Sequence, residues 1–182
     1  MFALAASLFF AAPAASQAPV DLAQVRASLD GVWEGKLEYL DYTSNKWFGI
    51  PVKTSVENQG DGATMLRKSD FDDGPTVGNV RITSVELFDT TKGTISIGTF
   101  RKGREPEISI YNVRLVGAPK DATHRTLLEE TTATDDNRPA MLRLTTVRDG
   151  NTLETLKEID FLDDEKVEWI TRNRTRVIRV GP

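Results

Sequence analysis

The sequence predicts an all-β protein: an antiparallel up-and-down closed β-barrel of about eight to ten strands, with a short N-terminal helix. In residues 31–41, Trp33, Leu37 and Tyr39 share one face of a period-two pattern and charged side chains share the other. This is typical of a strand with one buried and one solvent-exposed face. From residue 31 onward, turn residues divide the chain into about ten runs of roughly 8 to 13 residues. Closure into a barrel would remove the two exposed edges of an open sheet.

The N-terminal residues predict export. Residues 1–18 contain no charged side chain and begin with an apolar run that is followed by small residues. We expect them to be a signal peptide, with residues 19–182 forming one domain that is periplasmic or secreted. The chain has no cysteine, which excludes a lipid anchor through a lipobox cysteine and any disulfide. No membrane insertion is expected after signal cleavage, because no later apolar run approaches the length of a bilayer span.

Composition narrows the classes of partner. The chain has 23 basic and 27 acidic residues, a formal net charge of −4, with the two signs interspersed. Such a balance lacks the basic footprint of a nucleic-acid-binding protein and predicts no nucleic-acid partner. A small-molecule ligand remains the expected partner, and nothing in the sequence indicates an oligomeric state.

The elements follow from local patterns. A helix is predicted over 19–28, where Asp21 can cap it and apolar residues recur at helical spacing, so that it would cover one open end of the sheet. Pro51 lies inside the second predicted strand and indicates a bulge or a locally unpaired edge. The strands are predicted at 29–42, 46–58, 63–71, 79–89, 93–101, 107–116, 125–132, 138–148, 152–162 and 166–180.

The last three strands allow a prediction of register. A two-residue turn at 149–150 would place Leu142 opposite Lys157. A three-residue loop at 163–165 would then place Lys157 opposite Thr171. With these two turns, apolar residues share one face across all three strands, which we take as the inner face.

The start of the first strand resembles a known superfamily. Gly31-Val32-Trp33 follows a short helix and precedes a series of antiparallel hairpins, and it is similar to the G-x-W signature of lipocalins and calycins. The resemblance implies that a basic side chain of the final strand packs over Trp33. Arg179 lies at a position of the final strand that would face Trp33, and Arg176 is the alternative. The barrel-closing residues are therefore expected to be Gly31, Trp33 and Arg179.

The chain also departs from that family. About ten strands are predicted rather than the eight of a lipocalin, and the paired cysteines of many secreted lipocalins are absent. A calycin-like protein of the kind found among exported bacterial proteins fits better than a true lipocalin.

The predicted register places polar side chains inside the barrel. Burial of a lysine without a partner is costly, so an inward Lys157 implies a paired carboxylate such as Asp41 or a wet cavity. The alternative is a structural polar network in which Lys157 extends to the rim. The predicted pocket residues are Tyr39, Asp41, Ile50, Leu142, Lys157, Trp169, Thr171 and Asn173.

These patterns predict a binding protein for a small, partly apolar molecule held in the barrel interior, with no catalytic residue and no cofactor. Two alternatives remain open. A cell-envelope interaction module with a filled barrel would use an outer patch of Leu40, Tyr42 and Trp47. An enzyme would use Asp41 or Lys157 as general acid or base.

No metal site is predicted. The sequence has one histidine, His124, and no cysteine, which is too few ligands for zinc or copper. Haem ligation would rest on His124 alone. The acidic stretch 70–74 lacks the spacing of a calcium loop and is predicted to be a polar turn.

Overall fold

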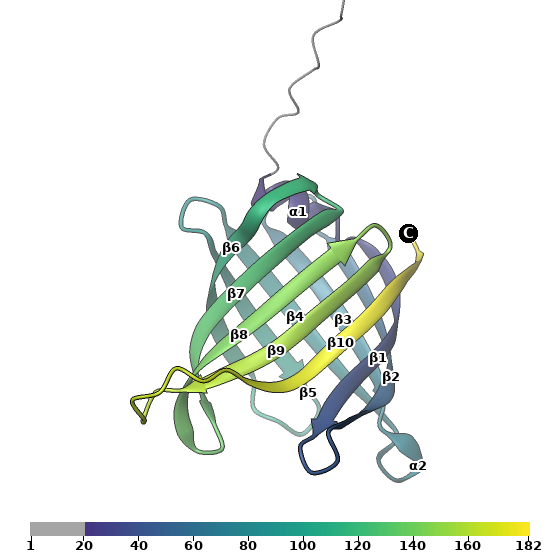
Figure 1. Ribbon diagram of the computed structural model, residues 1–182. Helices are drawn as coiled ribbons and strands as arrows, with labels where there is room; N and C mark the ends of the chain where they lie inside the picture. The colour runs from purple at the N-terminus through teal and green to yellow at the C-terminus, as the bar shows by residue number, and fades with distance from the viewer. Residues whose placement is uncertain (1–20) are drawn as a thin grey trace, which may run out of the picture.

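A computed structural model describes residues 21–182 of the protein, and the predicted signal peptide, residues 1–18, lies outside the described residues. Residues 21–182 form a short helix, α1 (Leu22–Ala27), followed by ten antiparallel strands that close into a barrel (Figure 1). This confirms the predicted fold class. The strands are β1 (Gly31–Asp41), β2 (Lys46–Asn58), β3 (Thr64–Asp72), β4 (Asn79–Asp89), β5 (Thr94–Arg101), β6 (Glu107–Asp121), β7 (His124–Asp135), β8 (Arg138–Asp149), β9 (Thr152–Phe161) and β10 (Ile170–Gly181), with a short helix α2 (Gly74–Val77) between β3 and β4.

The barrel is of the up-and-down type. Each strand pairs with the strands before and after it in the chain, and β1 pairs with β10 to close the ring. The closing register places Trp33 opposite Arg179. Helix α1 lies over one end of the barrel and α2 at the other (Figure 1).

Helix α1 closes its end of the barrel. The Asp21 side chain accepts a hydrogen bond from the Gln24 backbone N–H at 2.7 Å, and Oε1 of Gln24 accepts one from the Asp21 backbone N–H at 3.3 Å, which completes a capping box. Val25 is completely buried against a cluster that includes Phe88 and Ile95. No helix within residues 21–182 has the length and apolar character needed to cross a membrane.

The β8–β9 hairpin has the predicted faces but a different register. Its turn lies at residues 150–151, one residue later than predicted, so Leu144 rather than Leu142 opposes Lys157. When the turn moves by one residue along the chain, each residue of β8 is paired with a residue two positions further along β9. Such a shift leaves every side chain on its original face, and hydrophobic alternation cannot detect it.

A second correction concerns β10. The pairing with β9 shifts between Thr171 and Asn173, so Asn173 opposes Lys157 and Thr171 opposes Glu158. Thr171 was predicted to face Lys157. A bulge inserts one extra residue, and it therefore changes the face of the residues on one side of it.

Pro51 lies at an unpaired edge, the second of the two predicted alternatives. The pairing of β1 with β2 runs through Pro51 without a register shift. The pairing of β2 with β3 begins only at Val52, so the segment 46–51 has no partner on that side. The missing N–H of a proline is tolerated at such an edge.

Gly35 marks a close approach between β1 and β10. A Cβ atom at this position would clash with the carbonyl oxygen of Arg176 and lie 2.8 Å from the Cα atom of Val177. We expect Gly35→Ala to lower the free energy of unfolding in urea by about 1–3 kcal/mol, because backbone must move to accept the methyl group. Gly98→Ala is the control, since its Cβ would meet ordinary contacts from 3.5 Å outward. Equal losses in the two variants would contradict this explanation.

Candidate functional site

A cavity of about 340 Å³ lies inside the barrel. All ten strands contribute to its wall, because alternate residues of every strand point inward. Arg26 of α1 and Leu29 after it form the part of the wall nearest the helix. The apolar part of the wall consists of Leu29, Trp33, Val52, Phe71, Ile97, Tyr111, Leu127, Leu144, Leu153 and Val177.

Hydroxyl groups form much of the remaining wall. Thr54 and Ser69 share a hydrogen bond of 2.8 Å between β2 and β3, and Thr146 and Thr155 share one of 3.0 Å between β8 and β9. Each hydroxyl oxygen keeps further acceptor capacity. The cavity wall can therefore bind both apolar and polar parts of a molecule.

A buried ion-pair network joins α1 to the barrel wall. Glu86 of β4 is only 4% exposed; it accepts a hydrogen bond of 2.7 Å from Nε of Arg67 and forms an ion pair with Arg26. Nη1 of Arg26 also lies 3.8 Å from Oε1 of Glu129. Burial lowers the pKa of Arg26 to about 10, partly offset by Glu129. The ion pairs of Arg26 with the barrel wall thus hold helix α1 over the cavity.

Arg125 of β7 is a buried cation with few partners. It is 4% exposed, and its Nε atom donates to the carbonyl oxygen of Ala122 at 3.2 Å. Its Nη1 and Nη2 atoms are buried and have no hydrogen-bond partner within residues 21–182. Burial lowers the pKa of Arg125 to about 10, with a further lowering from the nearby charge of Arg148.

None of these charged wall residues was predicted from the sequence. Parity along the strands is the signal that could have found them. Arg125 and Glu129 flank the buried Leu127 at spacings of two, and Glu86 stands two residues before the buried Phe88.

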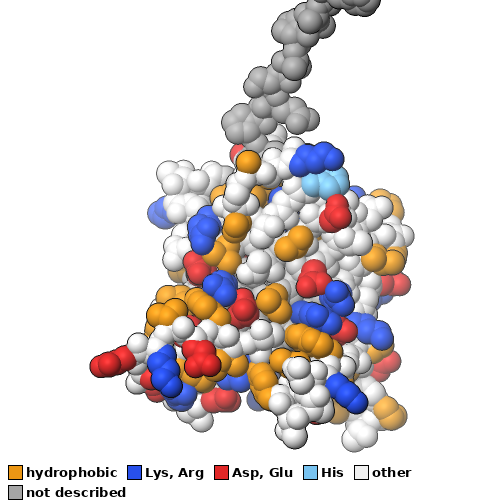
Figure 2. Space-filling view, in the orientation of Figure 1, with side chains coloured by type: hydrophobic (Ala, Val, Ile, Leu, Met, Phe, Trp, Pro, Cys, Tyr) orange, Lys and Arg blue, Asp and Glu red, His pale blue; other side chains and the backbone are white. Residues whose placement is uncertain are grey.

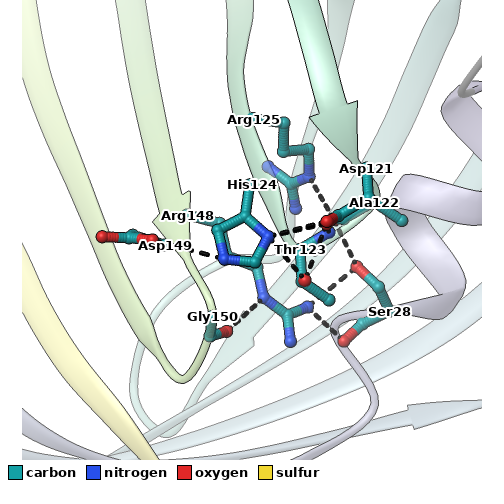
Figure 3. A network of polar contacts seen from close by, with 9 residues as sticks. All are labelled: Ser28, Asp121, Ala122, Thr123, His124, Arg125, Arg148, Asp149 and Gly150. Carbon is teal, nitrogen blue, oxygen red and sulfur yellow. Dashed lines mark hydrogen bonds and ion pairs between the residues drawn. The ribbon is translucent and has the colours of Figure 1, made fainter.

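The residue that faces Trp33 differs from the expectation. The guanidinium of Arg148, on β8, lies 5.1 Å from the centre of the Trp33 ring, and it also donates to Oγ of Ser28 at 2.8 Å (Figure 3). Arg179 was expected in this role. It opposes Trp33 in the register, but its Nε atom lies against Gly31, where a Cβ would be 2.8 Å away. The final strand therefore closes the barrel while β8 supplies the cation over the ring.

His124 lies at the same end of the barrel (Figure 3). Its Nδ1 atom is 2.8 Å from Oδ2 of Asp121, and its Nε2 atom is 3.4 Å from Oδ1 of Asp149. Hydrogen bonds from Thr123 and His124 lower the pKa of Asp121. Both ring nitrogens thus face carboxylates, and the histidine joins the β6–β7 turn to β8. Residues 21–182 contain no group of three or more side chains that could hold a metal ion.

Three predicted pocket residues meet on the inner face. Asn173 opposes Tyr39 on one side and Lys157 on the other. Tyr39 stacks on Phe48 with ring centres 5.5 Å apart. These side chains lie outside the cavity wall described above.

Leu142, Ile50 and Asp41 also lie outside that wall. Leu142 is buried in a small cluster with Ile159, and Ile50 opposes Leu37 between β1 and β2. Asp41 accepts hydrogen bonds from the Thr43 N–H at 2.9 Å and the Ser44 hydroxyl at 2.6 Å, the second being the main cause of its lowered pKa. Asp41 therefore stabilises the β1–β2 turn, and no ion pair of residues 21–182 joins it to Lys157.

Trp169 and Thr171 lie on the outer wall. The guanidinium of Arg143 lies 3.7 Å from the centre of the Trp169 ring, and it also pairs with Glu158 at 2.9 Å. The carbonyl oxygen of Thr171 accepts a hydrogen bond from the Tyr42 hydroxyl. The bulge in β10 explains why these two residues do not reach the inner face.

The outer wall carries interleaved charges on the side of β8 to β10, where Lys and Arg side chains alternate with Asp and Glu (Figure 2). Trp47, part of the predicted outer patch, lies under the guanidinium of Arg174 at 4.0 Å and is half-buried. A larger group of exposed apolar side chains occupies β4 to β6: Val85, Leu87, Phe100, Ile108 and Ile110.

The closed ten-strand barrel is compatible with a calycin-like architecture. A scan of protein-family models and a search of curated proteins gave no match to this chain. The barrel and its cavity are therefore the features that bear on function.

Proposed function

We propose that this protein is an exported, calycin-like barrel that binds a small, partly apolar molecule in its interior without transforming it. The observation that supports the proposal is the cavity of about 340 Å³, which falls within the range of roughly 300–1,000 Å³ found for small-molecule sites. Its wall combines leucine and valine side chains with hydroxyl groups. Such a wall suits a molecule that has an apolar body and at least one polar group.

Two further parts of the proposal have separate support. The calycin-like assignment is supported by closure of the barrel and by Gly31-Val32-Trp33 at the start of β1. Export is supported by the uncharged residues 1–18 of the sequence. Catalysis by Asp41 has no such support, because its carboxylate is engaged in the β1–β2 turn.

Native mass spectrometry of protein purified from its own host tests the binding function. We expect an additional mass on the folded protein that is lost on denaturation. Ser84 lines the cavity, so Ser84→Phe should fill it and abolish the bound species. Thr83→Phe is the matched control, because the neighbouring residue on the same strand faces outward and should leave binding intact.

The opposite result would favour the alternative function. A folded protein without any bound mass, and with no difference between the two phenylalanine variants, contradicts a binding cavity. The exposed group on β4 to β6 would then be the better candidate site, as a contact with a second copy of this chain. A dimer that Ile108→Lys dissociates would identify that role.

A further inference from the structure

The charged groups around the cavity do not balance. Three arginines, Arg26, Arg67 and Arg125, and two glutamates, Glu86 and Glu129, contribute to the wall. An excess of one positive charge therefore remains within the wall, and Arg148, which is 3% exposed, adds a further cation beside Arg125. A buried charge without a counter-charge is unfavourable, and proteins normally neutralise it or pair it.

The excess can be assigned to one side chain. Arg26 and Arg67 both pair with Glu86. Arg125 has one hydrogen bond through Nε, to a backbone carbonyl, while Nη1 and Nη2 are buried without a partner within the described chain. The unsatisfied edge of the guanidinium thus belongs to a residue that forms no ion pair within residues 21–182, and Glu129 only partly offsets the lowering of its pKa.

We propose that the molecule in the cavity carries a single negative charge, a carboxylate at the end of an apolar body, and that Arg125 pairs with it. This inference rests on the proposed binding function. One negative charge balances the excess within the wall. The planar guanidinium fork of Arg125 matches the two oxygens of a carboxylate. Leu127, Leu153 and Val177 of the same wall then contact the apolar body.

The position of Arg125 makes this pair a strong one. The residue stands at the α1 end of the barrel, where Arg148 lies near enough to lower its pKa further. Its terminal nitrogens are shielded from solvent. A charge-assisted hydrogen bond that is shielded from water is stronger than the same bond at a surface.

Isothermal titration with octanoate, octanol and octylamine tests the inference at a pH where the acid is ionised. These probes share one chain length and differ in the charge of the head group. We expect octanoate to bind wild-type protein at least about tenfold more tightly than octanol, the order expected for one charge-assisted bond, and octylamine to bind least. Arg125→Met should remove this preference, and Arg125→Lys should keep part of it.

Stability separates a binding role from a structural one. Without ligand, Arg125→Met should keep or raise the melting temperature, because it removes an unpartnered buried charge. The carbonyl oxygen of Ala122 keeps a hydrogen bond of 3.1 Å from Ser28. Arg114→Met, an exposed change on β6, is the matched control and should not alter binding of any probe.

The outcomes distinguish this inference from the proposed function. Octanol binding as tightly as octanoate to wild-type protein, with both excluded by Ser84→Phe, would overturn the carboxylate and leave the binding cavity. Equal octanoate affinity in wild-type protein and Arg125→Met would also overturn it. Failure of octanoate to bind would overturn the carboxylate, and the binding function would fall with it only if native mass spectrometry also shows no bound mass. If Arg125→Met does not fold, the ratio of octanoate to octanol affinity in wild-type protein still decides.

Discussion

Replacement of Glu86 by glutamine is expected to lower the free energy of unfolding by about 3–5 kcal/mol, the usual cost of removing one member of a buried ion pair. The Glu86 carboxylate is 4% exposed and pairs with both Arg26 and Arg67. Without it, the buried guanidinium of Arg26 and the partly buried one of Arg67 would have only Glu129 nearby as a counter-charge. Urea denaturation followed by far-ultraviolet circular dichroism measures the loss.

Two comparisons make the test specific. Glu34→Gln removes the same charge from an exposed pair with Lys53, whose atoms are 2.7 Å apart, and should cost less than about 1 kcal/mol. The double variant Arg26→Met, Glu86→Gln should recover part of the loss, because an apolar pair can replace a buried ionic one. Equal losses from Glu86→Gln and Glu34→Gln would show that the buried network does not stabilise the barrel.

The fold class was predictable because its signals are local. Residues 46–58 and 79–89 were predicted as strands with the bounds that the structure has. Turn residues punctuate each strand and a capping residue begins the helix, so these bounds depend on near neighbours in the chain. Closure followed from the number of strands and the need to remove edges.

Register was less predictable because it depends on single residues in turns and bulges. The β8–β9 turn is one residue later than expected, and the irregularity between Thr171 and Asn173 is invisible in the alternation pattern. Because of these two effects, several residues predicted to be on the inner face have pairing partners one or two positions away from those expected. Trp169 and Thr171 consequently lie on the outer wall. Their role as ligand contacts stays a prediction.

The charged network shows a deeper limit of sequence reasoning. On β4, Val85 and Leu87 are exposed by 41% and 52%, while Glu86 between them is buried. An apolar-inside rule applied to residues 85–87 alone assigns them to the wrong face, although Phe88 shares the inner face with Glu86. Parity with Phe88 could have indicated the face of Glu86, but its partners, Arg26 on α1 and Arg67 on β3, are distant in the sequence and no local pattern reveals them.

Trp33→Ala is expected to lower the free energy of unfolding by about 3–5 kcal/mol, the cost of a large cavity in a core. Trp33 is 1% exposed and packs in a cluster with Leu29 and Val177. Its Nε1 atom donates a buried hydrogen bond of 2.9 Å to the carbonyl oxygen of Leu29, just after α1. Urea denaturation should show the loss, and hydrogen exchange should show faster opening of α1 in the variant.

A matched series separates the contributions of this side chain. Trp33→Phe keeps much of the apolar contact but leaves the Leu29 carbonyl oxygen without its donor, so an intermediate loss is expected. Trp47→Ala removes an indole from the outer wall, where the ring is half-buried under Arg174, and should cost much less. Equal effects at the two tryptophans would contradict the role of Trp33 as the contact that holds α1 over the cavity. A loss confined to Trp33, with faster exchange in α1, would show that closure of this end and stability of the barrel depend on the same side chain.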